Sequence, residues 1–234
     1  MTLTVSVIIP TRNCEQTIEE CIVSLLKNQG RFEIVVVDDS TDRTPEIVSR
    51  YPVRLIKVQG KNVAEKRNIG ISLTTGEVIA FTDDDCEVPP WWLSKVERFF
   101  FDEKVGAVGG PNLTPEQATL SERCVGMALG SWFGSGISSA RYSAREKVES
   151  KEVDESKLIT CNLFLRRAAL EQTGLFNPNQ YPCDENELLQ RMKGKGYRLL
   201  YVPSLGVQHK RRQMFFPFAR QIYWYGIGRG VLVR

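Results

Sequence analysis

The sequence has little of what marks several large classes of protein. No run of about 18 apolar residues occurs, so no segment of the 234 residues is expected to span a bilayer. The beginning of the chain has neither the basic end nor the small-residue cleavage site of a signal peptide, and we therefore expect a cytoplasmic location. The formal net charge is only +3, whereas dedicated nucleic-acid binders carry densely clustered basic residues. Nucleic acid is therefore not an expected partner.

Several motifs are missing as well. There is no G-x-x-x-x-G-K-[ST] loop, no G-x-G-x-x-G after the first predicted strand and no G-x-S-x-G elbow. These absences argue against P-loop nucleotide hydrolases, dinucleotide-binding enzymes and α/β-hydrolases. The six cysteines include no C-x-x-C pair and accompany a single histidine, so structural zinc is not expected. Buried free thiols are the expected state.

What is present is a regular alternation of strand and helix patterns. The first half predicts strands at residues 3–9, 32–37, 53–58, 78–81 and 106–109, and helices at 14–27, 62–73 and 91–101, with a short helix after Pro45. Such alternation predicts an α/β fold with right-handed crossovers and a doubly wound, mostly parallel sheet. In the second half we expect a mobile loop within part of 126–157, a strand at 158–165, a helix at 185–193 and one or two short strands in 197–207.

The most informative stretch is the acidic run Asp83-Asp84-Asp85, which closes the apolar segment 76–81. Side chains two apart on an extended chain point to the same side, so Asp83 and Asp85 can converge on one point. Two carboxylates held together repel unless something neutralises them, and a divalent cation with oxygen ligands is the usual partner. The alternative interpretation is a solvated acidic turn at the end of a strand.

Polar residues also follow two other predicted strands. Thr11 and Arg12 leave the first strand, and Asp38 and Asp39 leave the second. In open parallel sheets, ligands bind beyond the carboxyl ends of the strands where the strand order reverses. These residues and the acidic run should therefore line one crevice, which would suit a nucleotide diphosphate coordinated through a cation.

The run Lys66-Arg67-Asn68 lies on the helix that precedes the acidic strand. As a functional element, Arg67 would lie near the phosphates, and Asn68 would reach the sugar or the acidic loop. The alternative is an exposed basic helix face.

In order along the chain, four stretches resemble a family-two inverting glycosyltransferase of GT-A fold: Val5–Asn13, Val35–Asp42, Arg67–Gly70 and Asp83–Asp85. The resemblance implies a Rossmann-like, mostly parallel sheet with helices on both faces, fused to a smaller acceptor-side half. It also implies that the chain uses a nucleotide sugar.

The same resemblance assigns roles to residues of the crevice. It implies that Pro10, Thr11, Arg12 and Asp39 hold the nucleoside, with Asp38 close by. Asp83 and Asp85 would be the DxD pair, which binds the donor ribose or diphosphate through Mg²⁺ or Mn²⁺, with Asp84 beside them on the donor. On the acceptor side, Asn112 and Asn162 lie in stretches that resemble the family's loop after the fifth strand and the strand beneath the acceptor.

The catalytic base is expected at Asp184 or Glu185. An inverting transfer needs a carboxylate that takes the proton of the acceptor hydroxyl. The family usually carries Glu-Asp at a helix start, whereas the order here is Asp184-Glu185, and the spacing to Leu188 and Arg191 puts Glu185 in the usual Asp place. Asp184 is slightly favoured as the shorter side chain. The alternative is that both acids only favour a helix N-terminus.

His209, the single histidine, follows the last predicted strand. Enzymes of GT-A fold often bring a residue of this region to the metal or diphosphate, and a neutral imidazole suits a transition metal. A packed or surface histidine is the alternative. The tail from residue 211 mixes aromatic and basic residues, which fits either a helix packed on the body or a membrane interface.

We therefore predict a metal-dependent inverting glycosyltransferase that moves a hexose, from GDP-mannose or UDP-glucose, to a hydroxyl or a polyprenyl-phosphate-type acceptor. We expect residues 1–110 to bind the nucleotide sugar and residues 111–210 to bind the acceptor and supply the base. Residues 211–234 are expected to meet the cytoplasmic face of a membrane. We also expect the natural chain to continue into transmembrane helices. A sugar nucleotidyltransferase would need a glycine-rich loop with a lysine after the first strand. Residues 10–13 do not form such a loop. A non-catalytic sugar-nucleotide-binding module would not need Asp184 or Glu185.

Overall fold

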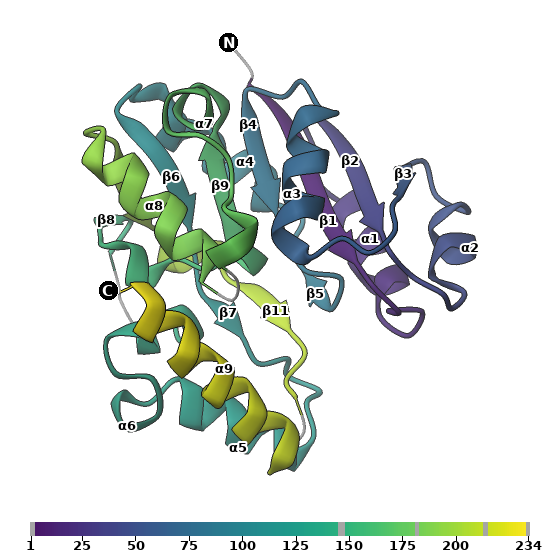
Figure 1. The fold of residues 1–234 in the computed structure, drawn as a ribbon, viewed down its shortest axis with the longest axis vertical. Coiled ribbons are helices and arrows are strands. Elements are labelled where there is room, and N and C mark those ends of the chain that lie inside the picture. Colours follow the sequence, from purple (N-terminus) through teal and green to yellow (C-terminus); the bar gives the residue numbers. More distant parts are fainter. Residues whose placement is uncertain (1–2, 145–147, 181–182, 213–214, 233–234) are drawn as a thin grey trace.

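The computed structural model describes residues 3–144, 148–180, 183–212 and 215–232, and it is built around one large sheet (Figure 1). The eight strands run in the order β3-β2-β1-β4-β9-β6-β10-β8. They are β1 (Thr4–Thr11), β2 (Arg31–Asp38), β3 (Arg54–Lys57), β4 (Val78–Phe81), β6 (Val105–Gly109), β8 (Lys151–Glu152), β9 (Leu163–Arg166) and β10 (Arg198–Tyr201). Neighbours are parallel except for β9, which is antiparallel to β4 and β6, and β8, which is antiparallel to β10.

Helices cover both faces of this sheet because the strand residues alternate between two apolar cores. Val7 and Ile9 of β1 face one core, and Ile8 between them faces the other. The first core is closed by α1 (Ile18–Leu26), α2 (Thr44–Val48) and α4 (Trp92–Val96). The second core is closed by α3 (Val63–Ser72), α7 (Arg167–Thr173) and α8 (Asp184–Gly194). The predicted α/β fold, with a mostly parallel sheet and helices on both faces, is confirmed.

Two local details differ from the predictions. A mobile loop was predicted within part of 126–157, whereas its first half is helical: α5 (Leu120–Leu129) and α6 (Trp132–Ser135) are followed by a 3₁₀ helix at Gly136–Tyr142, and residues 145–147 lie outside the described part. The strand expected at 158–165 is shorter, because a 3₁₀ turn at Thr160–Asn162 precedes β9. This turn places Cys161 and Asn162 below the carboxyl end of β4 instead of in the sheet.

A second, three-stranded sheet lies beyond the carboxyl ends of the large one. It consists of β5 (Cys86–Glu87), β11 (Val207–His209) and β7 (Asn112–Leu113), in the order β5-β11-β7. β5 and β11 are antiparallel, with Cys86 directly opposite His209. This pairing carries His209, from near the end of the chain, back to the acidic run that ends just before β5.

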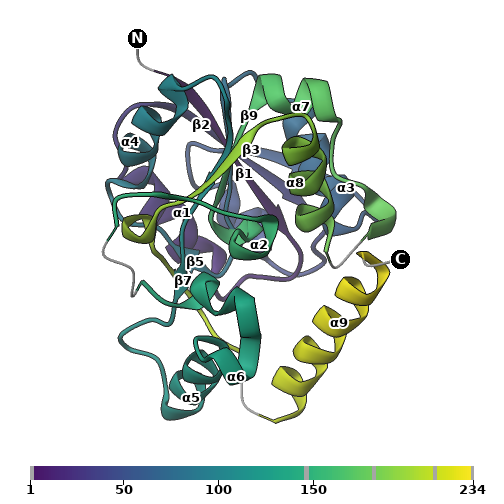
Figure 2. The same cartoon turned by 90° about the vertical axis from the view of Figure 1, so that its left-hand side faces the viewer.

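The last helix, α9 (Phe216–Leu232), lies with α5 and α6 at the end of the molecule away from the N-terminus (Figures 1 and 2). Each helix within the described ranges is too short or too polar to cross a bilayer. The large sheet takes strands from both sides of residue 110, with β9 inserted between β4 and β6. The nucleotide-side and acceptor-side residues are therefore held by one continuous framework.

Candidate active site

The loops that follow β1 and β2 are tied together around Asp38. The Thr11 hydroxyl donates to Asp38 Oδ1 at 2.7 Å, and the Ser40 hydroxyl donates to the same oxygen at 2.6 Å. Asp38 is buried, whereas Arg12 is exposed and Asp39 half-buried. Asp38 therefore shapes the loop from within, and Arg12 and Asp39 are the residues of this pair of loops that a ligand can reach. Pro10 and Thr11 are buried beneath them.

The acidic run lies at the point where the strand order reverses, since β1 has β2 on one side and β4 on the other. One carboxylate oxygen each of Asp83 and Asp85 and a ring nitrogen of His209 lie within 4.8 Å of one another. His209 Nε2 is 3.0 Å from Asp85 Oδ1. The structure thus brings together three side chains that the sequence places up to 126 positions apart, and their oxygen and nitrogen atoms are suitable ligands for a divalent cation.

The electrostatics of this group favour a bound positive charge. Burial raises the pKa of Asp83 to about 7, because a carboxylate loses solvation there. For Asp85, burial acts in the same direction, but the neighbouring His209 outweighs it and the pKa is lowered. Asp83 therefore lacks a full counter-charge in the protein itself, and a cation beside both carboxylates would supply it.

Asp84 belongs to the other side of the run. Burial and the charge of Asp85 raise its pKa to about 6, while Cys14 and Lys66 act in the opposite direction. Lys66 is buried, and its ammonium donates to the carbonyl oxygen of Thr11 at 2.8 Å. Asp84 therefore faces the loop after β1, where the nucleoside is expected, and Lys66 lies inside the framework between them.

The exposed basic helix face considered for α3 is not present. Asn62 and Glu65 form a capping box that starts the helix, and Lys66 and Arg67 are both buried. Arg67 Nη1 is 2.7 Å from Asp184 Oδ2, and its Nη2 donates to the Thr160 hydroxyl at 2.9 Å. The Arg67 guanidinium is thus held against the start of α8.

Asn68 is hydrogen-bonded to the backbone of the segment between α7 and α8. Its amide donates to the carbonyl of Phe176 at 2.8 Å and accepts from the Phe176 amide at 3.0 Å. This pair of bonds fixes the turn between α7 and α8 to α3. The contacts place Asn68 at that turn and not at the acidic run.

Asp184 and Glu185 form the first turn of α8, and both are buried. Asp184 has Arg67 as its partner, whereas Glu185 Oε1 lies 3.5 Å from Arg141 Nη1. Burial raises the pKa of Glu185, Arg141 opposes the rise, and the neighbouring Asp184 adds to it. The two acids are therefore held by different arginines, and the more loosely paired one is the better proton acceptor near neutral pH.

The two asparagines predicted on the acceptor side are both buried with engaged amides. Asn162 accepts from Trp92 Nε1 at 2.9 Å and donates to the carbonyls of Pro111 and Leu205. Asn112 accepts from Arg211 Nη1 at 3.0 Å. These bonds hold the 3₁₀ turn and the small sheet together.

Buried side-chain polar atoms without a hydrogen bond gather around this site. Among the described residues they are Arg67 Nε, Thr82 Oγ1, Arg141 Nε and His209 Nδ1. Such atoms are rare in native proteins, and each one indicates strain or a partner that the protein alone does not supply. They belong to residues next to the acidic run or to the first turn of α8, where a polar ligand would satisfy them.

Sequence reasoning missed two members of the site. Arg141 belongs to the segment that was predicted as a loop, and Thr160 belongs to a predicted strand. Neither carries a local motif. Both become visible only when the fold brings them to Glu185 and Arg67.

An open, mostly parallel sheet of this order, with polar residues gathered at the strand switch, is the arrangement in which α/β proteins bind ligands. The sequence model of glycosyl transferase family 2 matches residues 6–174, and the chain belongs to this family. The predicted family and enzyme class are thereby confirmed, in preference to a nucleotidyltransferase or a non-catalytic module.

Individual proteins agree with this assignment. Glycosyltransferase AglE of Haloferax volcanii is 26% identical over 220 residues, which are 89% of this chain and 67% of AglE. The low-salt glycan biosynthesis hexosyltransferase Agl6 of the same organism is 31% identical over 155 residues, 61% of this chain and 38% of Agl6. Among solved structures, a similar one is the mannosyltransferase PcManGT of Pyrobaculum calidifontis, solved in complex with GDP-Man and Mn²⁺. It superposes with a TM-score of 0.70 and is 22% identical, and the match covers 94% of this chain and 60% of PcManGT. The chain thus spans between about a third and two thirds of these proteins.

Proposed function

We propose that the protein is a metal-dependent inverting glycosyltransferase that moves a hexose from a nucleotide diphosphate sugar to a hydroxyl or lipid-phosphate acceptor. The observation that carries this proposal is the group formed by Asp83, Asp85 and His209 at the switch point of the sheet. Arg67 lies between this group and the two acids that begin α8, because the charges of Asp184, Asp83 and Glu185 all raise the pKa of its guanidinium. Metal ligands and a candidate base therefore border the same space.

The residues present fit a divalent cation. The three ligand atoms are close enough to share one ion, and His209 Nδ1 is buried with no hydrogen-bond partner in the described ranges. Asp85, Asp83 and His209 would hold Mn²⁺ or Mg²⁺. When bound, the ion supplies a Lewis acid for the departing diphosphate. PcManGT, which shares the fold, was solved with Mn²⁺.

The nucleoside would lie over the loops after β1 and β2. Arg12 and Asp39 are accessible there, Asp39 also accepts the Gly60 amide at 3.1 Å, and Asp38 and Thr11 fix the loop beneath. Asp84 would border this ligand from the β4 side. A carboxylate such as Asp39 can accept hydrogen bonds from ribose hydroxyls, and Arg12 can meet phosphate oxygens. GDP-mannose, the ligand of PcManGT, and UDP-glucose are the donors we propose.

Glu185 is the base that we favour, which reverses the slight preference that chain length gave to Asp184. Asp184 is committed to a 2.7 Å ion pair with Arg67, whereas Arg141 lies 3.5 Å from Glu185. Burial raises the pKa of Glu185, which makes it a stronger proton acceptor. The spacing to Leu188 and Arg191 puts Glu185 in the family's usual base position. Glu185 would take the proton of the acceptor hydroxyl, and Asp184 would position Arg67.

A polyprenyl-phosphate-type acceptor would be met at the cytoplasmic face of a membrane. Large apolar side chains are exposed on α5, α6 and α9, at one end of the molecule (Figures 1 and 2): Leu120, Met127, Trp132, Phe133, Phe216, Tyr223 and Trp224. Aromatic and basic residues mixed on a helix are typical of a membrane interface. We propose this end as the membrane-facing one.

Calorimetric titration with nucleotide sugars tests the donor and metal assignment together. GDP-mannose and UDP-glucose are each titrated into the protein with Mn²⁺ and with a chelator. We expect Mn²⁺-dependent binding of one of them, and a loss of roughly 10–100-fold or more in Mn²⁺-dependent affinity in Asp85→Asn. Asp102→Asn, on an exposed carboxylate paired with Arg198, is the matched control and should bind as the unmodified chain does. Equal Mn²⁺-dependent affinity in Asp85→Asn would show that the pocket is assigned wrongly.

A further inference from the structure

We propose that Cys86, Cys161 and His209 form a second metal site, selective for a thiophilic divalent cation such as Zn²⁺. The site is separate in chemistry from the carboxylate group of Asp83 and Asp85, because it offers two sulfurs and one nitrogen. It rests on the placement of these three side chains and does not depend on the proposed transferase activity.

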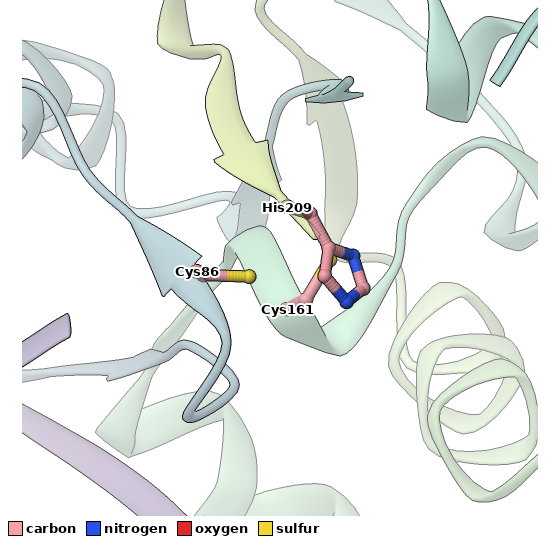
Figure 3. A group of neighbouring side chains, drawn as sticks. All are labelled: Cys86, Cys161 and His209. Atoms are coloured by element: carbon pink, nitrogen blue, oxygen red, sulfur yellow. The ribbon is translucent and has the colours of Figure 1, made fainter. Parts of the chain in front are cut away.

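The fold brings the three residues together from three distant elements. Cys86 and His209 are direct cross-strand partners of β5 and β11, so their side chains leave the small sheet side by side. Cys161 comes from the 3₁₀ turn before β9. Figure 3 shows the Cys86 sulfur pointing toward Cys161 and His209. The two sulfurs and a ring nitrogen of His209 lie within 4.8 Å of one another.

This spacing matches the requirements of zinc. A Zn²⁺ ion lies about 2.3 Å from thiolate sulfur and about 2.0 Å from imidazole nitrogen, so its ligand atoms must lie within roughly 4.6 Å of each other. The ligand atoms here, within 4.8 Å of one another, are close to that limit. Two cysteines, one histidine and an open fourth position are a recognised zinc ligand set. Softer sulfur ligands favour zinc over manganese or magnesium, which take oxygen.

The surroundings favour a formed site. Both cysteines are buried, and no disulfide joins them. The buried Asn112 donates to Cys161 Sγ at 3.3 Å, and Asn112 is itself held by Arg211. Such outer partners orient a ligand atom. A side-chain hydrogen bond between His209 and Cys161 keeps the imidazole beside this sulfur.

The two metal sites share His209. His209 belongs both to the group with the two sulfurs and to the group with Asp83 and Asp85, and its Nε2 lies 3.0 Å from Asp85 Oδ1. Hard and soft cations would therefore compete for one residue. Cys86 directly follows Asp85 in the chain, so the β5–β11 pairing that places His209 opposite Cys86 also brings it to the acidic run.

Metal titration of the intact chain, reduced with a non-thiol reductant, tests the site. Cd²⁺ serves as the spectroscopic probe, because thiolate-to-cadmium charge transfer gives near-ultraviolet absorption, and Zn²⁺ affinity is measured by competition with a chromophoric chelator. We expect one equivalent of Cd²⁺ to give the absorption. Cys86→Ser and Cys161→Ser should each remove it and lower Zn²⁺ affinity by roughly 100-fold or more. Cys124→Ser, on α5, is the control and should change neither.

The unmodified chain provides a test that does not depend on whether the variants fold. Absence of the Cd²⁺ absorption in that chain overturns the proposal. Absorption that persists in both folded Cys86→Ser and folded Cys161→Ser, as judged by unchanged melting without metal, overturns it as well, because the thiolates would then lie elsewhere.

Discussion

Asp184 and Glu185 are adjacent in the chain, yet their side chains have different partners and different environments. Asp184 balances the charge of Arg67 at 2.7 Å, and both side chains are buried. Removing one partner of a buried pair leaves an uncompensated charge, which costs more than the pair itself contributes. Glu185 has the more distant Arg141 and a raised pKa. The proposed positioning residue and the proposed base can therefore be told apart by measuring stability and turnover in the same two variants.

We predict opposite profiles for Glu185→Gln and Asp184→Asn. Glu185→Gln should lower the turnover number for transfer by roughly 100-fold or more, since general-base catalysis contributes about 10²–10⁴-fold, while donor binding with Mn²⁺ stays unchanged. Asp184→Asn should lower the free energy of unfolding by roughly 3–5 kcal/mol, because Arg67 loses its counter-charge. Denaturant unfolding and steady-state kinetics check both. A fully active Glu185→Gln beside a stable, inactive Asp184→Asn would transfer the role of base to Asp184.

At this scale the acids could be predicted and their partners could not. Asp83, Asp85, Asp184 and Glu185 stand in motifs that mark their positions along the chain. The Arg67–Asp184 pair joins residues 117 positions apart, and no local pattern encodes it. The same holds for the Cys86–Cys161–His209 group: without a C-x-x-C spacing the cysteines gave no sign of a metal site, and only the fold makes them neighbours.

Among the elements, α3 packs on β1 more closely than any side chain at Gly70 would allow. A Cβ at this position would lie 2.5 Å from Ile8 Cγ2, inside the second core. The close approach sets the depth of α3, and with it the positions of Lys66 and Arg67 one turn earlier.

We therefore expect Gly70→Ala to lower the free energy of unfolding by roughly 1–3 kcal/mol, the usual cost of overpacking a core. The matched control is Gly194→Ala at the end of α8, where nothing lies within 4 Å of the added methyl group. That control should be neutral or gain up to about 1 kcal/mol from helix propensity. Urea unfolding of both variants decides the matter, and equal stability of the two would contradict the close packing of α3 on β1.

The elements of the first half could be predicted because apolar alternation and glycine or proline punctuation agree there. The helices in 120–142 were missed because Gly126, Gly130 and several serines suggested a loop. One signal was available: Thr119 and Glu122 form a capping box, and the Thr-x-x-Glu spacing that encodes it is visible in the sequence. Burial of Val125 and Leu129 against the body then stabilises α5 despite its glycines.

On the scale of the whole molecule, the topological switch rule predicted where the acidic run would lie, because it follows from strand order alone. The small sheet β5-β11-β7 did not follow from any pattern, since its strands have only two or three residues each. That sheet nevertheless determines the site, as it joins residues near 86, 112 and 208. It also directs the chain that leaves β11 toward α9.

The exposed aromatic residues of α9 give the molecule one apolar end. Phe216 is 90% exposed and Trp224 45% exposed, and Arg220 on the same helix is exposed. Such a surface is costly in water, and insertion of the aromatic rings into the headgroup region would relieve that cost while the arginine meets anionic lipid. We therefore predict that the protein binds vesicles containing anionic phospholipid, as measured by flotation.

The variant Phe216→Ser/Trp224→Ser tests which end binds. Each large apolar side chain contributes about 1.5–3 kcal/mol on burial, so the double change should lower vesicle affinity by roughly ten-fold or more. Phe101→Ser removes an aromatic ring that is 64% exposed on the 3₁₀ helix after α4, away from this end, and should leave binding unchanged. Because the active-site residues lie on other elements, donor binding with Mn²⁺ should be equal in all three proteins. Vesicle binding that falls equally in both variants, or is absent from the unmodified chain, would mean that α9 does not face lipid.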